Sequence, residues 1–398
     1  MVLCYACAVG GQTTISFWHG YSELETVVLE EQLIPLFEAA NPGIRVEAVR
    51  LGYDELRDKI VATAAIGSGP DVIRMDIIWS PSFAAAGLLE PLDHYAGFQV
   101  ILDEVYPGPL STNYLDGKYY GLPLTTNTQI YIYDVHAFEA AGVTPPQTFA
   151  DFETVSRRMT QRDGGVVTRY GYDMGGPWAW YLLSWIWSNG GDVTDPEITT
   201  ASGYLDGGAT VEALTMISEW ALEGLLAPNI FGEGFDQWGS FVNGKVAARQ
   251  DGPWFARWLE EENPNFKAGY TVMPVGRGGV SCSVVGGENI ALTSGSKSKD
   301  EAWKFICFML SEEAQGIMAA NGQVPVIRSA VDIPEFQASD YYPVYLEQLL
   351  TAKARTPHPR YSEIEQIMQD AFWNTVTGET NARNALSEAV RLINPVLE

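Results

Sequence analysis

The chain has 398 residues, 46% of them hydrophobic, a length that suits two or three domains or one two-lobed unit with a large core. Fifty acidic residues against 24 basic ones give a net charge of −26, which repels phosphate backbones and anionic lipid headgroups. This charge argues against a nucleic-acid binder or a peripheral membrane protein. No apolar run approaches the length of a bilayer span, so the sequence predicts no transmembrane helix.

Residues 1–11 are mostly apolar and small, and Ala6-Cys7-Ala8 fits an A-x-A processing site. We interpret this segment as a residual export signal, with a disordered tail as the alternative. Cys7 is also a candidate acylated residue of a lipoprotein, although Cys4 stands where such a site prefers Leu. A lone C-x-x-C and four histidines in the whole chain give little support for a zinc site, so we expect no metal and no cofactor.

The first structured part alternates between two periodicities. Residues 14–18 and 44–49 are β-prone, and 71–75 form a third strand after a Gly-Ser-Gly-Pro break. Apolar residues at three- and four-residue steps predict a helix over 23–40, and Asp54 begins another. This β-α-β-α-β order predicts parallel strands joined by helical crossovers.

Ligands collect beyond the carboxyl ends of such strands. Here those ends carry His19-Gly20-Tyr21 and Asp76, and we therefore expect Asp76 to have a function.

Two later segments, 119–133 and 283–292, are predicted to be strands that cross between lobes. Ser362 and Glu365 fit a capping box at the start of a helix. Helical patterns are predicted over 149–162, 178–188, 209–223, 300–320, 340–352, 362–373 and 382–393.

Signatures of nucleotide binding and of common hydrolases are absent: the chain has no GxxxxGK[ST], GxGxxG, GxSxG or HExxH. Asp76 with Glu23 or Glu288 is a conceivable glycosidase pair, but sequence spacing cannot establish the separation of the two carboxyl groups that this mechanism needs.

Aromatic residues give the positive signal, because many of the 12 Trp and 19 Tyr stand beside Gly, Pro, Asp or Asn. Trp178 and Trp254 follow Gly-Pro turns, and Trp79 follows Asp76, whereas Trp185 and Trp187 lie in an apolar helix and are predicted core residues. A flat ring covers the C–H face of a sugar, and Asp, Asn, Glu and Arg bond its hydroxyls. The pattern therefore indicates a carbohydrate site.

From about Thr14 to its end, the chain resembles the extracellular solute-binding proteins of ABC importers, in the carbohydrate group that includes maltose- and trehalose-binding proteins. The resemblance depends on the order and spacing of many short segments. They are ISFWHG, FEAANPGIRVE, GSGPDVIRMD, AAAGLLEPLD, GKYYGLPL, AGVTPPQTFADFE, WSNGGDV, GKVAARQDGPW, VMPVGRGG, VGGENIAL and SKSKDEAWKFICFMLSEEAQ.

The resemblance implies an α/β, two-lobed periplasmic-binding-protein-like fold of type II, with a ligand cleft between lobes joined by hinge strands. The first lobe would hold 12–124 and 290–328, and the second 125–289 and 329–398. It implies a periplasmic or extracellular monomer without catalytic activity. This protein would close around a sugar, as a Venus flytrap does, and deliver it to the transmembrane subunits of a permease.

The resemblance also implies a set of sugar-contacting positions, to which the pattern of aromatic residues adds Trp79. The expected ligand-binding residues are His19, Tyr21, Glu23, Asp76, Trp79, Asn127, Trp178, Trp254, Gly287, Glu288 and Arg355.

Glu288 departs from the family pattern, since several sugar binders have Trp or Asn after the Gly-Gly turn. That departure leaves the sugar open and could favour an amino or otherwise basic group. A second reading is a binder of glycerol phosphate esters, because FWHG also resembles that branch. Its phosphate would need Arg74, Arg328 or Arg355.

Overall fold

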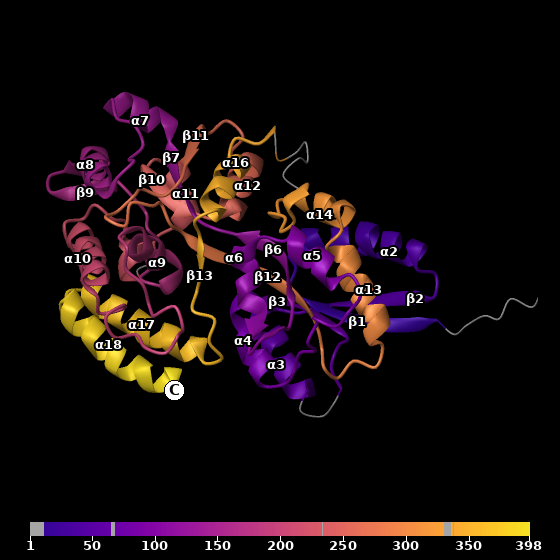
Figure 1. Cartoon of the computed structure of the whole chain (residues 1–398). Coiled ribbons are helices and arrows are strands. Elements are labelled where there is room, and N and C mark those ends of the chain that lie inside the picture. The colour runs from indigo at the N-terminus through magenta and orange to yellow at the C-terminus, as the bar shows by residue number, and fades with distance from the viewer. Residues whose placement is uncertain (1–11, 65–67, 233, 330–335, 337) are drawn as a thin grey trace, which may run out of the picture. The chain divides into compact units, whose positions relative to one another are not determined.

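The computed structural model describes residues 12–64, 68–232, 234–329, 336 and 338–398, and the proposed export segment and Cys7 lie outside them. The chain forms two compact units (Figure 1). Unit 1 comprises Met1–Thr126 and Gly287–Ile333, and unit 2 comprises Asn127–Gly286 and Pro334–Glu398. The chain therefore passes from one unit to the other after Thr126, after Gly286 and once more between residues 329 and 336. The lobe borders expected from the sequence fall at 124, 289 and 328.

Unit 1 begins with the predicted parallel strands, and β1 pairs with both β2 and β3. Its first elements are β1 (Thr13–His19), α1 (Glu23–Val28), the π-helical turn η1 (Leu29–Leu33), α2 (Ile34–Ala40), β2 (Ile44–Arg50), α3 (Tyr53–Ala64) and β3 (Val72–Asp76). The β-α-β-α-β prediction is confirmed, and the helix expected over 23–40 contains a π-helical turn.

Unit 1 continues with short elements and ends with two helices. These elements are η2 (Ile77–Trp79), α4 (Ser80–Ala85), α5 (Phe98–Glu104), α6 (Pro107–Leu110), η3 (Ser111–Asn113), β4 (Tyr114–Leu115), β5 (Lys118–Tyr119), β6 (Leu122–Asn127), α13 (Lys299–Met309) and α14 (Glu312–Ala319). The single helix expected over 300–320 is two helices, because Ser311 caps the second one.

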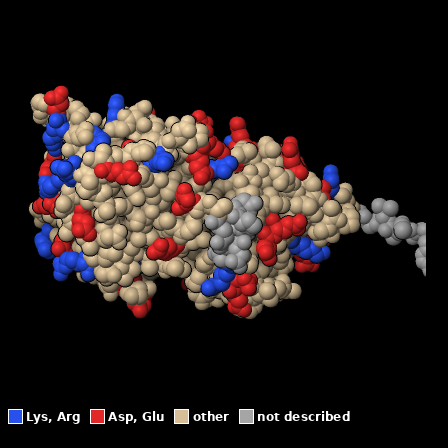
Figure 2. Space-filling model, turned by 90° about the horizontal axis from the view of Figure 1, so that it is seen from above, with Lys and Arg blue, Asp and Glu red and all other residues tan. Residues whose placement is uncertain are grey.

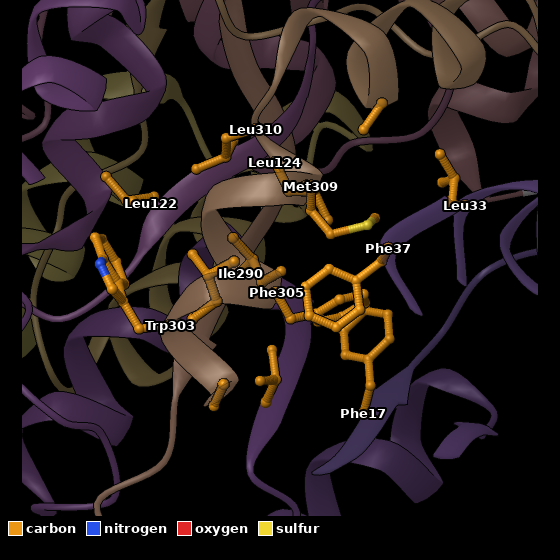
Figure 3. Packing of buried hydrophobic residues seen from close by; sticks show 14 of the residues in the cluster. Phe17, Leu33, Phe37, Leu122, Leu124, Ile290, Trp303, Phe305, Met309 and Leu310 are labelled. Atoms are coloured by element: carbon orange, nitrogen blue, oxygen red, sulfur yellow. The ribbon is translucent and has the colours of Figure 1, made fainter. Parts of the chain in front are cut away.

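The core of unit 1 forms where α2 and α13 cover the sheet (Figure 3). Alternate side chains of β1 are buried, among them Phe17, as the period of a half-buried strand requires. The Phe305 ring lies 5.2 Å from that of Phe17 and 5.1 Å from that of Phe37, both edge-on. Such aromatic pairs stabilise the core by more than the burial of their surface area alone, so they help to hold the sheet against the helices.

β12 (Val284–Leu292) belongs to both units along its length. Val284 and Val285 pair with β13 (Lys353–Ala354) in unit 2. From Glu288 to Leu292, β12 pairs antiparallel with β3 in unit 1, and β6 also pairs with it. The strand predicted over 283–292 is therefore present and supplies one of the passages between the units.

Gly287 of β12 has a φ of 126°, and a Cβ atom there would lie 2.2 Å from the Thr125 carbonyl oxygen. The backbone conformation and the close Thr125 carbonyl therefore explain why a glycine stands at position 287. Gly287→Ala is expected to lower the free energy of unfolding of unit 1 by about 3 kcal/mol, because it adds backbone strain and a clash. Thermal unfolding followed by circular dichroism measures this loss.

Gly295→Ala is the matched control in the same unit, since nothing lies within 4 Å of a Cβ there. Its stability should stay within about 0.5 kcal/mol of wild type. Equal stability of the two variants would contradict this account of Gly287.

Unit 2 contains a small antiparallel sheet in which β7 (Ile130–Asp134) lies between β10 (Ala248–Asp251) and β11 (Ala268–Thr271). Trp185 and Trp187 are buried in its helix α9 (Ala179–Ser188), as predicted. Its other elements are α7 (Val135–Ala141), α8 (Phe149–Met159), β8 (Gln161–Asp163), β9 (Val166–Arg169), α9 (Ala179–Ser188), α10 (Gly208–Leu222), η4 (Pro228–Phe231), α11 (Gln237–Val242), α12 (Pro253–Glu262), α16 (Tyr342–Leu349), α17 (Tyr361–Val376) and α18 (Ala382–Leu397).

The capping box predicted from Ser362 and Glu365 is wrong. α17 begins one residue earlier, and no side chain caps it. Glu365 instead forms an ion pair with Arg355 at 3.3 Å, which draws its carboxylate away from the helix N-terminus.

Acidic side chains are dispersed over the face drawn in Figure 2, with basic ones among them. Within the described ranges, no helix combines the length and apolar character that a membrane crossing needs.

Candidate functional site

In unit 1, charged side chains gather where the parallel strands β1 and β3 end. Arg74 and Asp76 alternate on one face of β3, and Glu288 of β12 stands directly opposite Asp76 in the register. We call Glu25, Arg74, Asp76 and Glu288 the acidic cluster. It joins residues from three separate parts of the sequence at the strand edge where ligands of α/β sheets bind.

Arg74 is the centre of this cluster. Its guanidinium is buried, its Nη2 lies 3.0 Å from Glu288 Oε2, and its Cζ lies 4.0 Å from the centre of the Tyr21 ring. The Thr125 hydroxyl donates to the same Glu288 oxygen at 2.6 Å. Burial raises the pKa of Glu288, whereas Arg74 and Thr125 act in the opposite direction. Without Arg74, Glu288 would lose the cation of its ion pair.

Glu25 is a cluster residue that the sequence analysis missed. It forms a capping box with Ser22 at the start of α1, and its other oxygen accepts from Gln323. Burial works against its charge, but Arg74 and these hydrogen bonds outweigh burial and lower its pKa. The S-x-x-E pattern of residues 22–25 could have identified it as a cap.

Asp76 and Glu23 differ in how firmly they are held. Asp76 accepts from the Tyr53 hydroxyl at 3.1 Å and from the Ile78 N–H at 2.9 Å, so both of its oxygens are oriented. Glu23 is exposed and lies 3.7 Å from Arg50, a separation that gives only a weak surface ion pair.

Several predicted contact residues of unit 1 lie in its interior. Tyr21 is buried beneath Arg74, and Trp79 packs in the core against Tyr53 and Phe83. His19 is also buried, and its Nδ1 accepts from the Tyr21 N–H at 3.3 Å. In this structure these side chains support the cluster and offer almost no surface to a ligand.

His19 gives the fold a pH dependence. Burial first, and then Arg74, lower its pKa from 6.5 to about 4. Between those pH values His19 is protonated in the unfolded chain but stays neutral in the folded chain. The free energy of unfolding therefore falls as pH falls from 6.5 to 4. His19→Asn is expected to remove up to about 3 kcal/mol of this pH-dependent loss. Urea unfolding of both proteins between pH 7 and pH 4 measures the two slopes, and parallel slopes would refute the assignment.

In unit 2, three tryptophans lie at the N-terminal ends of α9 and α12. Trp178 and Trp254 are 43% and 40% exposed, and the Trp180 and Trp254 rings lie 6.2 Å apart at 31°. We call Trp178, Trp180 and Trp254 the tryptophan cluster. Trp180 was not among the predicted contacts, although it stands in the same GPWAW segment as Trp178.

Glycines give two of these rings their positions. A Cβ atom at Gly176 would lie 2.2 Å from the Trp178 ring, and one at Gly252 would lie 2.3 Å from the Trp254 ring. Each indole therefore packs flat over the glycine two residues before it, leaving one face outward. The G-P-W sequence thus encodes a fixed and exposed ring.

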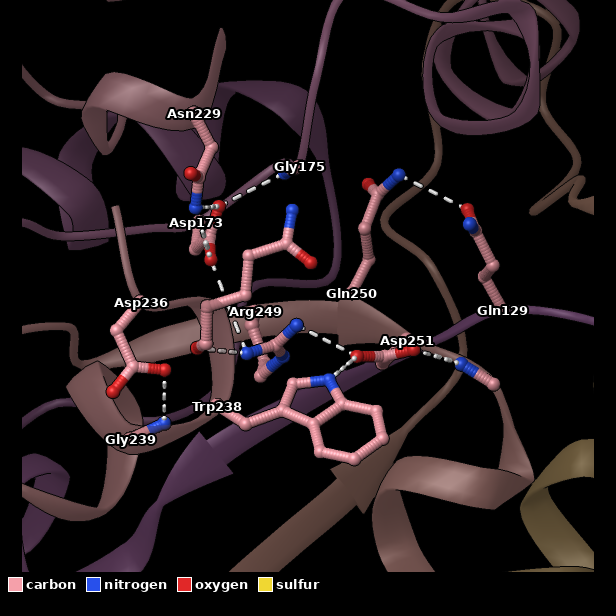
Figure 4. A network of polar contacts seen from close by, with 12 residues as sticks. Gln129, Asp173, Gly175, Asn229, Asp236, Trp238, Gly239, Arg249, Gln250 and Asp251 are labelled. Carbon is pink, nitrogen blue, oxygen red and sulfur yellow. Dashed lines mark hydrogen bonds and ion pairs between the residues drawn. The ribbon is translucent and has the colours of Figure 1, made fainter. Parts of the chain in front are cut away.

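A buried polar network holds the two ring-bearing segments together (Figure 4). Asp173 and Arg249 form a parallel bridge, so both segments leave the sheet side by side. Arg249 Nη2 donates to Asp251 Oδ2 at 2.6 Å, and its Nη1 lies 3.9 Å from Asp173. Asp173 accepts from the Gly175 N–H and Asp251 from the Gly252 N–H, at 2.9 and 2.8 Å.

The remaining predicted residues of unit 2 lie beside Trp180. The Arg355 guanidinium is 5.5 Å from the centre of its ring. A Cβ at Gly286 would lie 2.2 Å from Asn127 Oδ1 and 2.7 Å from the Trp180 ring. The Asn127 side-chain oxygen is buried and has no hydrogen-bond partner among the described residues.

These surroundings bear on the phosphate reading. Arg74 is paired with Glu288, Arg355 with Glu365, and Arg328 lies over the Tyr106 ring. The arginines proposed for a phosphate are thus engaged elsewhere, and the alternative is not favoured. Nor do the described residues contain a group of three His, Cys, Asp or Glu arranged to hold a metal ion.

Unit 1 thus presents oriented carboxylates, and unit 2 presents exposed indole rings. Residues 20–316 match the bacterial extracellular solute-binding proteins, and the chain belongs to this family. Its fold is the two-lobed type II fold of periplasmic binding proteins, as the sequence indicated. The sugar-binding protein MalE from Xanthomonas citri superposes with a TM-score of 0.86 at 25% identity, covering 97% of each chain.

Curated relatives extend the comparison. A binding protein of Brucella abortus (strain 2308) is 26% identical over 92% of this chain and 89% of its own length. The maltotriose-binding protein of Pyrococcus abyssi (strain GE5 / Orsay) is 26% identical over 82% of this chain and 69% of its own.

Proposed function

We propose that this protein captures a di- or oligosaccharide and delivers it to the transmembrane subunits of an ABC permease. The tryptophan cluster carries the proposal: its exposed indoles, fixed over glycines by a buried network, suit the C–H faces of sugar rings. The acidic cluster supplies oriented acceptors for hydroxyls. The names of the relatives support a maltooligosaccharide as the class of ligand.

The proposed contact residues follow from these positions. They are Glu23, Asp76, Asn127, Trp178, Trp180, Trp254, Glu288 and Arg355. His19, Tyr21, Trp79 and Gly287 are proposed to support them from beneath.

Calorimetric titration with maltose, maltotriose, trehalose and glycerophosphocholine tests the function. We expect heat from at least one sugar, with a change in Trp fluorescence, and none from the phosphodiester. Binding of glycerophosphocholine alone would overturn the proposal, and so would silence with every sugar.

We further propose that the protein acts outside the cytoplasmic membrane as a monomer, either free or anchored through a lipid, as suits an extracellular family. Light scattering with and without sugar tests the monomer, and mass spectrometry of the protein purified from its native membrane fraction tests the lipid.

A further inference from the structure

The carboxylate of Glu288 is held asymmetrically. Both its ion pair with Arg74 and its hydrogen bond from Thr125 engage Oε2. Within the described residues, no hydrogen bond reaches Oε1, and the side chain is 31% exposed. One oxygen is thus fixed by the protein, and the other is available.

Arg74, which holds this oxygen, is more deeply buried than the Glu288 carboxylate. The Arg74 side chain is only 6% exposed, and Tyr21 covers the other face of its guanidinium. It therefore cannot reach a ligand as easily as Glu288 can, but it determines where the Glu288 carboxylate points.

We propose that Arg74 is a positioning residue for sugar recognition: it holds one oxygen of Glu288 so that the other accepts a hydrogen bond from a ligand hydroxyl. The inference rests on the proposed function and deepens it, since this wall of the site would require a hydrogen-bond donor and exclude an anionic group. A basic group on the ligand is then not required, because Arg74 already balances the charge of Glu288.

The arrangement implies a pH signature. Ionised Glu288 is the stronger acceptor, and the groups that face it are Arg74 and Asp76 on β3, Thr125 on β6 and Glu25 on α1. Arg74 lowers the pKa of Glu288, and the two other carboxylates and burial raise it. Removing Arg74 should therefore raise the pH at which sugar binding is lost on acidification.

The experiment titrates maltotriose into wild type, Arg74→Met, Glu288→Gln and the double variant between pH 5 and pH 8. Hydrogen bonds to charged groups contribute about 1.5–3 kcal/mol, so each single variant should bind roughly 10- to 100-fold more weakly at pH 7. The double variant should be no weaker than Glu288→Gln, because Arg74 acts through Glu288. Arg74→Met should lose affinity at higher pH than wild type, and Glu288→Gln should show no such dependence.

Arg45→Met is the control, because Arg45 forms an exposed pair with Glu38 in the same unit, and it should bind as wild type does. If Arg74→Met does not fold, Arg74→Lys replaces it, with an expected affinity between wild type and Glu288→Gln. Unchanged affinity in Arg74→Met or Arg74→Lys, even with a lower melting temperature, would show that Arg74 has only a structural role. That result would overturn the inference. If wild type itself gives no heat with maltotriose or any other sugar, the proposed function fails first.

Discussion

Replacing Trp254 by Ala is expected to weaken sugar binding about 30-fold, and Trp178→Ala should have a comparable effect. Each indole offers a fixed outward face, and truncating such a buried anchor of a complex costs about 2 kcal/mol. The rings are fixed over Gly252 and Gly176 before the ligand arrives, so little ordering entropy opposes stacking. Calorimetric titration of the preferred sugar gives the affinities.

Trp373→Ala is the matched control for this experiment. Trp373 is 39% exposed, belongs to the same unit and also packs against a glycine, Gly232, yet it lies on α17 outside the tryptophan cluster. It should bind sugar as wild type does. An equal loss in the three variants would show that removing any exposed indole disturbs the protein and would contradict the assignment.

Arg249→Met is expected to lower the free energy of unfolding of unit 2 by about 3–5 kcal/mol. The substitution leaves Asp173 and Asp251 buried without their cation, and breaking a buried pair from one side costs about that much. Because the chain has two units, differential scanning calorimetry is preferable to a single-transition fit. The transition of unit 2 should move to lower temperature, while that of unit 1 should stay.

Arg277→Met removes an exposed pair with Glu212 in the same unit and should cost at most about 1 kcal/mol. Equal melting temperatures for Arg249→Met and Arg277→Met would contradict a supporting role for the buried network.

The fold of the first part could be predicted because its signals are local. The strand and helix periods of residues 14–75 alternate, and helical crossovers between successive strands favour parallel pairing, which the pairing of β1 with β2 and β3 confirms. The break between α13 and α14 was not predicted, because apolar spacing continues through Leu310 and only Ser311 marks the new start.

The acidic cluster could be predicted only in part. Asp76 followed from its place at the end of a strand, and Glu288 from a resemblance. That these two stand opposite each other, and that Arg74 reaches Glu288, depends on the register of β12 against β3, which no local pattern encodes. Glu365 shows that a local pattern can also mislead. Its spacing from Ser362 fits a capping box, but in the structure Glu365 forms an ion pair with Arg355 instead.

Trp178 and Trp254 were easier to predict, because each follows a Gly-Pro turn and packs over the glycine two residues before it. Trp180 was missed, since its ring meets that of Trp254 only in the folded unit. The buried network was missed as well, since Asp173 and Arg249 are far apart in sequence and meet only in the folded sheet.

Hydrogen–deuterium exchange with and without saturating maltotriose tests the central claim most directly, because it reads both clusters in one experiment. The account predicts that sugar slows exchange in residues 19–25 and 286–288, which adjoin the acidic cluster, and in residues 176–181 and 252–256, which carry the tryptophan cluster. Tight binding that leaves exchange in these segments unchanged would contradict it.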